Sequence, residues 1–306
     1  MTTYLIQRLL SAVAVIVGLV CVTFLASHFI GDPVFMMIDR ELDTPEDRQR
    51  LIEAGGFDQP VWEQFAVYIG DVARGDFGNS LWQNRPATEV VLERVPATAL
   101  LAGSVLLVTW LIAIPLAIVA GRRAGSWVDT AITTVSVGVS SFSSFWFGLV
   151  LIIIFAVKLG WLPTSGYGGI RYLVLPVLAL APAMAARVTQ VLQTSVASEL
   201  RQQYVATARA KGLPERTVMS RHVLRNTALL GLTLLGGEVV SLMNGVILVE
   251  TIFAWPGVGQ ISLQAIEKRD VRVLMAAVFY IGLLVTVLNI AVDLIYTYID
   301  PRVRLK

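Results

Sequence analysis

The chain has 306 residues, of which 56% are hydrophobic and only 15% are charged, and its formal net charge is +2. A soluble domain of similar length has roughly a quarter of its residues charged, so most of this chain is expected to avoid water. The net charge is also too small to indicate a protein that binds nucleic acid. The composition therefore predicts an integral membrane protein.

Six apolar stretches are long enough to cross a bilayer, for which a helix needs roughly 20 residues. In chain order they are Leu9 to Phe29, Ala97 to Gly121, Ala131 to Val157, Leu173 to Val196, Thr227 to Val249 and Val273 to Val292. The fourth is interrupted by Arg187 and by two prolines that should kink it, and the fifth by Glu238. We predict an all-α polytopic membrane protein with six transmembrane helices.

The first stretch has one feature of a cleaved signal peptide, because Arg8 precedes it. It is longer than the roughly 7 to 15 residues of a signal-peptide core, and no small-x-small cleavage site follows Phe29. We expect an uncleaved helix. The single cysteine, Cys21, lies within it and excludes an internal disulfide.

The distribution of lysine and arginine predicts the orientation of the chain. With the N-terminus inside, the inner segments hold thirteen Lys and Arg residues, against five in the two short outer loops. Both termini are therefore predicted to be cytoplasmic, and residues 30–96 to form a long extracytoplasmic loop. An acidic stretch from Asp39 to Glu53 and aromatic residues at helical spacing predict short surface helices there. The loop either caps the helices or docks an external partner, and the sequence leaves both open.

The sequence lacks the motifs of common catalytic sites. No Gly-x4-Gly-Lys-Ser/Thr phosphate loop occurs, and Ala210-Lys211-Gly212 does not supply one. The only histidines, His28 and His222, are predicted near opposite faces of the membrane, and no Gly-x-Ser-x-Gly motif is present. We expect no catalytic residue, no metal site and no cofactor in this chain. If ATP drives the protein, another chain must hydrolyse it.

Residues 198–226 form the most informative segment, a basic loop on the predicted cytoplasmic side. Ser198 is a plausible helix N-cap, and Glu199 would lie in the first turn, where the helix dipole favours an acid. Gly212 can end this helix in the left-handed conformation, and Pro214 can take the first position of a second helix. These residues predict a helix-Gly-helix elbow. An ordinary basic loop held at the lipid headgroups is the alternative.

The segment Tyr204 to Leu213, followed by His222 to Asn226, resembles the EAA loop of ABC-importer permeases, most closely in the dipeptide/oligopeptide/nickel branch. Further matches to that branch run along the whole chain in family order. They are Tyr4 to Leu10, Gly31-Asp32-Pro33, Gly75 to Ser80, Glu250 to Gly259 and Asp300 to Arg304.

The resemblance implies a single permease domain over residues 1–306 with the type I importer fold, in a bacterial or archaeal plasma (inner) membrane. Such a subunit is not an enzyme and forms half of a translocation path for a small solute, most often di- or oligopeptides. It implies three kinds of partner: a second homologous permease chain in a heterodimer, two ATP-binding cassette ATPase domains and an extracytoplasmic substrate-binding protein. The family also includes carriers of nickel chelates, opines, haem and sugars, and no residue here decides the substrate.

Two positions depart from the general family pattern. Its leading glutamate falls on Ala206 and its closing proline on Arg225, so the resemblance carries over no glutamate-mediated contact. The ATPase-coupling role that it implies is assigned instead to four residues. They are Ala206, Ala208, Gly212 and Leu224.

Glu238 is the first candidate for the translocation path, because a charge near the bilayer centre costs about 2.5 to 3.5 kcal/mol and needs a partner or a wet cavity. Asn244 is the second and follows six residues later. For Glu238 a structural hydrogen bond is an equally strong interpretation. Two other function classes also stay open: a secondary transporter in which Glu238 carries a proton or cation, and a structural membrane scaffold.

Overall fold

A computed structural model describes residues 2–29 and 59–299, and within these ranges the regular elements are helices with one isolated antiparallel bridge between Asn79 and Pro86. The prediction of an all-helical protein is confirmed for this part of the chain. The acidic stretch from Asp39 to Glu53 and the family matches at Gly31-Asp32-Pro33 and Asp300 to Arg304 lie outside the described residues.

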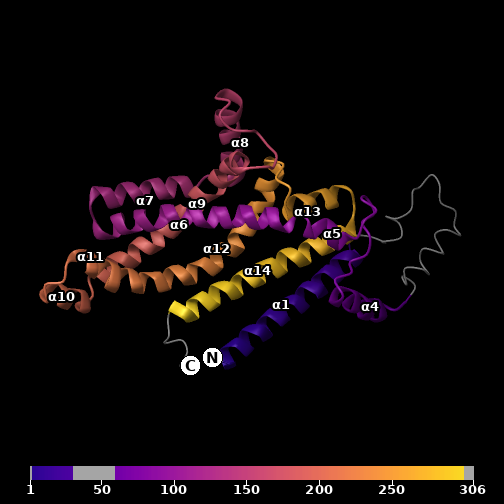
Figure 1. Cartoon of the computed structure of the whole chain (residues 1–306), viewed down its shortest axis with the longest axis horizontal. Coiled ribbons are helices and arrows are strands. Elements are labelled where there is room, and N and C mark those ends of the chain that lie inside the picture. Colours follow the sequence, from indigo (N-terminus) through magenta and orange to yellow (C-terminus); the bar gives the residue numbers. More distant parts are fainter. Residues whose placement is uncertain (1, 30–58, 300–306) are drawn as a thin grey trace. The chain divides into compact units, whose positions relative to one another are not determined.

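Five long helices dominate the described ranges, with shorter helices between them (Figure 1). The long helices are α1 (Thr2–Phe29), α6 (Val95–Arg122), α9 (Ile170–Leu200), α12 (Leu224–Ile252) and α14 (Val271–Ile299). The shorter ones are α4 (Val61–Ala73), α5 (Ala87–Leu92), α7 (Trp127–Ser140), α8 (Ser144–Leu151), α10 (Gln203–Ala210), α11 (Glu215–Thr217) and α13 (Val258–Glu267). Two short π-helical segments complete the set: η1 (Ile152–Lys158) and η2 (Val218–Val223).

Four helical segments of the described part are long and apolar enough to cross a bilayer, and a bent pair makes a fifth if it counts as one span. The four are Ala87–Arg122, Ile170–Leu200, Glu215–Ile252 and Val271–Val292. Each contains one of the predicted spans, so these predictions are confirmed as helices. In α1 the apolar part that can be assessed is shorter and runs from Leu10 to Leu25.

The predicted span from Ala131 to Val157 is found as a bent pair of helices, which crosses a bilayer as one span only if the two halves are counted together. Helix α7 ends at Ser140 and α8 starts at Ser144, with an angle of 92° between the two halves. The hydroxyls of Ser140 and Ser141 both donate to the carbonyl of Val137, at 3.0 and 2.8 Å. Serine side chains that bond to nearby backbone compete with the helical ladder, which explains why the break falls within this serine-rich run.

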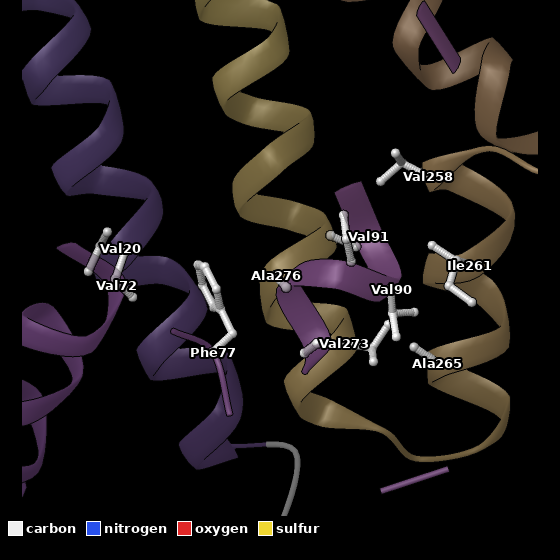
Figure 2. Close-up of a cluster of buried hydrophobic side chains, with 12 residues drawn as sticks. Val20, Val72, Phe77, Val90, Val91, Val258, Ile261, Ala265, Val273 and Ala276 are labelled. Carbon is white, nitrogen blue, oxygen red and sulfur yellow. The ribbon is translucent and has the colours of Figure 1, made fainter. Parts of the chain in front are cut away.

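The chain divides into two compact units, the first made of residues 1–98 and 256–286. Its apolar core joins α1, α4, α5, α13 and α14, and Figure 2 shows Val90 and Val91 of α5 between α13 and α14. Both valines are at most 2% exposed. The prediction of short surface helices in the long loop is confirmed by α4, whereas α5 is buried in this core.

A buried carboxylate fixes the Gly75 to Ser80 segment within the first unit. Asp270 is 1% exposed and accepts a hydrogen bond of 2.5 Å from the hydroxyl of Ser80. Its other oxygen accepts from the backbone N–H of Val273 at 3.2 Å, so Asp270 also caps the start of α14. The carboxylate thus ties the loop before α5 to the corner between α13 and α14.

The second unit comprises residues 99–255 and 287–306 and is built around α9. This helix packs against α7, α8 and α12, and it is the most buried of the four candidate spans (Figure 1). On another side it meets α6, where Ala113 and Ala117 lie against Ala185 and Val188. Because protein rather than lipid covers most of α9, the helix can contain two prolines.

The close approach of α6 to α9 depends on Gly121. A Cβ atom at this position would lie 2.7 Å from the Cβ of Val196 and 2.8 Å from the carbonyl oxygen of Gln193. We predict that Gly121→Ala lowers the free energy of unfolding by about 1 to 3 kcal/mol, the usual cost of overpacking. Thermal unfolding of the purified protein in detergent measures this change.

Gly138 in α7 supplies the matched control, because a Cβ there would meet nothing within 4 Å. Gly138→Ala should leave the unfolding midpoint unchanged or raise it slightly, since alanine favours a helix over glycine by about 1 kcal/mol. Equal midpoints for both variants would contradict the proposed role of Gly121.

Candidate functional site

The elbow, defined here as residues 198–226, lies at the end of the second unit where α9 gives way to α12 (Figure 1). The predicted N-cap at Ser198 is wrong, because α9 continues through Leu200 and the Ser198 hydroxyl donates within it to the carbonyl of Ser195. The chain breaks only at Arg201 and Gln202. No glycine or proline stands near Ser198, so nothing in the local sequence ends α9 there.

The predicted end of the first elbow helix at Gly212 is confirmed. Its φ is +76°, and its N–H donates to the carbonyl of Arg209 at 2.9 Å. The N–H of Leu213 donates to the carbonyl of Ala208 at 3.3 Å. Together these two bonds form the Schellman arrangement that commonly closes a helix at a left-handed glycine. Pro214 stands one position earlier than predicted, as the cap before α11 rather than its first residue.

The two arms of the elbow enclose a small apolar core of their own. Val205 from α10 and Val218 from η2 are both 0% exposed. The buried members of this core are Val196, Val205, Ala208, Val218, Met219 and Val223. Since Val196 belongs to α9, the core joins the elbow to the transmembrane helices, so the elbow is a packed part of the second unit rather than a free loop.

The four residues that the resemblance assigned to ATPase coupling fall into two pairs. Ala208 is 5% exposed and Leu224 packs against the same core, so both contribute to the interior of the elbow. Ala206 and Gly212 lie on its surface, and a Cβ at Gly212 would meet nothing within 4 Å.

A bidentate ion pair bridges the turn at Gly212. Arg209 donates through Nε and Nη2 to the two oxygens of Glu215, at 3.1 and 2.8 Å. The hydrogen bond from Arg209 lowers the pKa of Glu215 below its ordinary value, so the pair is charged at neutral pH. Both side chains are more than 40% exposed, which limits such a pair to less than about 1 kcal/mol.

A second polar contact closes the root of the elbow, where α9 ends and α12 starts. The hydroxyl of Tyr204 donates to the carboxylate of Glu199, and Asn226 donates to the Tyr204 oxygen at 3.0 Å and to Glu199 at 3.3 Å. Partial burial, and then the hydrogen bond to Glu199, raise the pKa of Tyr204. The tyrosine is therefore neutral, and its hydroxyl donates to Glu199 of α9 and accepts from Asn226 of α12. Sequence reasoning missed this contact, because Glu199 and Asn226 are 27 residues apart.

An ion pair joins the middle of α9 to the middle of α12. Arg187 donates through Nη2 to one oxygen of Glu238 at 3.1 Å and through Nε to the other at 3.5 Å. The expectation that Glu238 needs a partner is met by this arginine. Asn244 is exposed on α12, six residues after Glu238. The sequence marked both charges as interruptions of apolar runs, and their pairing required the packing of α9 on α12.

The chain matches a protein family described as the binding-protein-dependent transport system inner membrane component, over residues 113–305. It is 34% identical to the oligopeptide transport system permease protein AppB of Bacillus subtilis (strain 168), over 99% of this chain and 100% of that protein. It is 31% identical to the di/tripeptide transport system permease protein DppB of Pseudomonas aeruginosa (strain UCBPP-PA14), over 99% of each chain. It is 34% identical to the glutathione transport system permease protein GsiC of Escherichia coli (strain K12), over 100% of each chain.

We predict that the apolar core contributes more to the stability of the elbow than the ion pair between Arg209 and Glu215 does. Val205→Ala removes two buried methyl groups and costs about 2 kcal/mol, so local opening should become about 30 times more frequent. Glu215→Gln removes an exposed ion pair, and opening should rise no more than about fivefold. Hydrogen exchange of the backbone amides of residues 203–217 measures both. A larger effect of Glu215→Gln would contradict this ranking.

Proposed function

This chain belongs to the binding-protein-dependent transport system inner membrane component family, and on that premise we propose that it forms half of the translocation path of an ATP-driven importer for di- or oligopeptides. It is a multi-pass membrane permease subunit, similar along its whole length to peptide and oligopeptide permeases. The observation that carries the coupling role is the elbow, a packed body continuous with α9 and α12.

Peptides are the substrate class that the relatives favour. The names of three of them refer to oligopeptides, to di- and tripeptides and to glutathione, itself a small peptide derivative. Among the substrates open at the level of sequence, these names support peptides over nickel chelates, opines, haem and sugars.

We propose six transmembrane passages with both termini in the cytoplasm of a bacterial or archaeal cell. Five would be α1, α6, α9, α12 and α14, and the sixth the bent pair of α7 with α8 and η1. This topology places the turn between α6 and α7 and the elbow on the cytoplasmic side, where the positive-inside rule expects their basic residues.

The proposed partners are a second, homologous permease chain, two ATP-binding cassette ATPase domains and an extracytoplasmic substrate-binding protein. On the elbow, Ala206 and Gly212 would form the contact with an ATPase, because both are exposed. Ala208 and Leu224 would transmit the motion, because they fill the core that joins α10 to η2 and α12. Small residues at the surface suit this role, since they let another backbone approach closely.

The assembled complex in proteoliposomes tests the function directly. A defined mixture of di- to pentapeptides is presented with the binding protein, and accumulated peptides are identified by mass spectrometry. We expect accumulation that requires ATP on the ATPase side and persists with an uncoupler. Uptake that survives ATP depletion and stops with the uncoupler would instead support a secondary transporter.

Gly212 should be essential for coupling because of its backbone conformation rather than for lack of space. A β-branched residue at φ +76° is strained by about 1 to 3 kcal/mol, enough to shift the conformation of the turn by about five- to a hundredfold. We predict that Gly212→Val reduces the peptide transported per ATP hydrolysed while membrane insertion is unchanged. Gly212→Asn should retain most transport, because asparagine tolerates this conformation.

Gly125, in the turn between α6 and α7, is the matched control for Gly212. It also has a positive φ, +81°, and open space around its Cβ position. Gly125→Val should leave the ratio of transport to ATP hydrolysis near that of the unsubstituted protein. Unchanged coupling in Gly212→Val would contradict the proposed role of the elbow.

A further inference from the structure

We propose that Arg187 binds the terminal carboxylate of the transported peptide, with Glu238 as the counter-ion that holds the arginine when the path is empty. This inference rests on the proposed function as a peptide permease. It assigns a recognition step to the permease itself, in addition to any selection by an external binding protein.

The ion pair leaves part of the guanidinium available to a ligand. Arg187 has five N–H donors, of which Nε and Nη2 are directed to Glu238 and Ser241. Two of these three contacts are 3.5 Å long, at the limit of a hydrogen bond. Within the described part of the chain, Nη1 has no hydrogen-bond partner. A carboxylate could therefore bind the outer edge of the guanidinium through two short bonds.

The exposure of the pair is asymmetric. The side chain of Glu238 is 15% exposed, whereas that of Arg187 is 43% exposed although it lies at the middle of a membrane helix. An arginine this exposed would be costly against lipid, so the surface around it must be covered by water or by protein. The arginine is the member of the pair that a solute in a water-filled path would meet.

The surface on either side of the pair is suited to a wet path. On α9 the exposed residues from Arg187 onward lie in steps of four, three and four, which is one face of a helix: Arg187, Val191, Thr194 and Ser198. On α12 a similar exposed face contains Gly237, Ser241, Asn244, Leu248 and Thr251. The contact between Arg187 and Ser241 joins the two faces at the ion pair. Because α9 and α12 run in opposite directions, the α9 face extends from the pair toward the elbow and the α12 face extends away from it. Polar groups recur along both, which is unusual for a surface in contact with lipid.

The chemistry of peptides explains why a carboxylate is the expected ligand. Peptides differ in their side chains, but every unmodified one carries a terminal carboxylate, so an arginine recognises all of them without regard to sequence. Arginine is the side chain best suited to bidentate binding of a carboxylate. Because Glu238 neutralises the arginine in the empty path, the membrane interior does not hold an uncompensated charge between transport cycles.

The test compares the two halves of the pair in reconstituted complexes. The probes are the peptides of the mixture that the unsubstituted complex imports, each prepared as the free acid and as the C-terminal amide. The binding protein is supplied at saturating concentration, and transport per ATP hydrolysed is measured for each form. An unsubstituted complex that imports no peptide would overturn the proposed function, whereas import without a role for Arg187 would overturn this inference alone.

We expect the two single variants to differ in their preference for the free acid over the amide. Arg187→Gln should reduce import of the free acid about tenfold or more, the effect of losing a charge-assisted hydrogen bond, and should leave import of the amide unchanged. Glu238→Gln should retain the preference for the free acid, because the arginine is still present. Arg123→Gln, which removes an exposed arginine outside the pair, should behave as the unsubstituted complex.

The double variant Arg187→Glu/Glu238→Arg separates recognition from folding. It keeps an ion pair between α9 and α12, so the protein should reach normal abundance in the membrane, but import of the free acid should stay low. Recovery of import in the double variant would overturn the proposal, because the pair would then be only structural. Equal loss of free acid and amide in Arg187→Gln would overturn it as well.

Discussion

In the lipid bilayer no water is present to satisfy a polar group, and the arrangement of the second unit follows from this constraint. Every helix there bonds its own backbone, and each charge needs a partner or a wet surface. Helix α9 meets these demands by lying between α6, α7, α8 and α12. Protein neighbours cover it, so its sequence can be less apolar than that of a helix in lipid. Arg187 can lie at its centre because α12 supplies Glu238.

The long helices were predictable from the sequence because the bilayer fixes how many apolar residues a span needs. The bend between α7 and α8 was not predictable. Serine hydroxyls can donate hydrogen bonds to nearby backbone carbonyls, and a few serines do not make an apolar stretch too polar to be counted as a span. The last turns of α9 were also missed. A serine followed by a glutamate is typical of a helix N-terminus, but the same pair can also lie inside a longer helix, as it does in α9.

At the elbow, the sequence predicted the turn because only glycine readily takes the backbone angle that closes α10 there. It could not tell which of the small residues face outward. Ala206 and Ala208 are two positions apart and lie on different sides of α10, one exposed and one in the core. Which side is buried depends on η2, whose packing against α10 is a tertiary contact. The pairs that join α9 to α12 were hidden from sequence reasoning for the same reason.

The pairing of Arg187 with Glu238 also has a consequence for the synthesis and membrane insertion of the protein. The two residues are 51 positions apart, and the arginine is made first. At a translation rate of about 5 to 20 residues per second, the ribosome needs roughly 3 to 10 seconds to reach the glutamate. During this interval the nascent α9 has its arginine without the acid that will neutralise it. The helix must therefore stay beside the insertion machinery, or near water, until α12 emerges and the two can enter the membrane together.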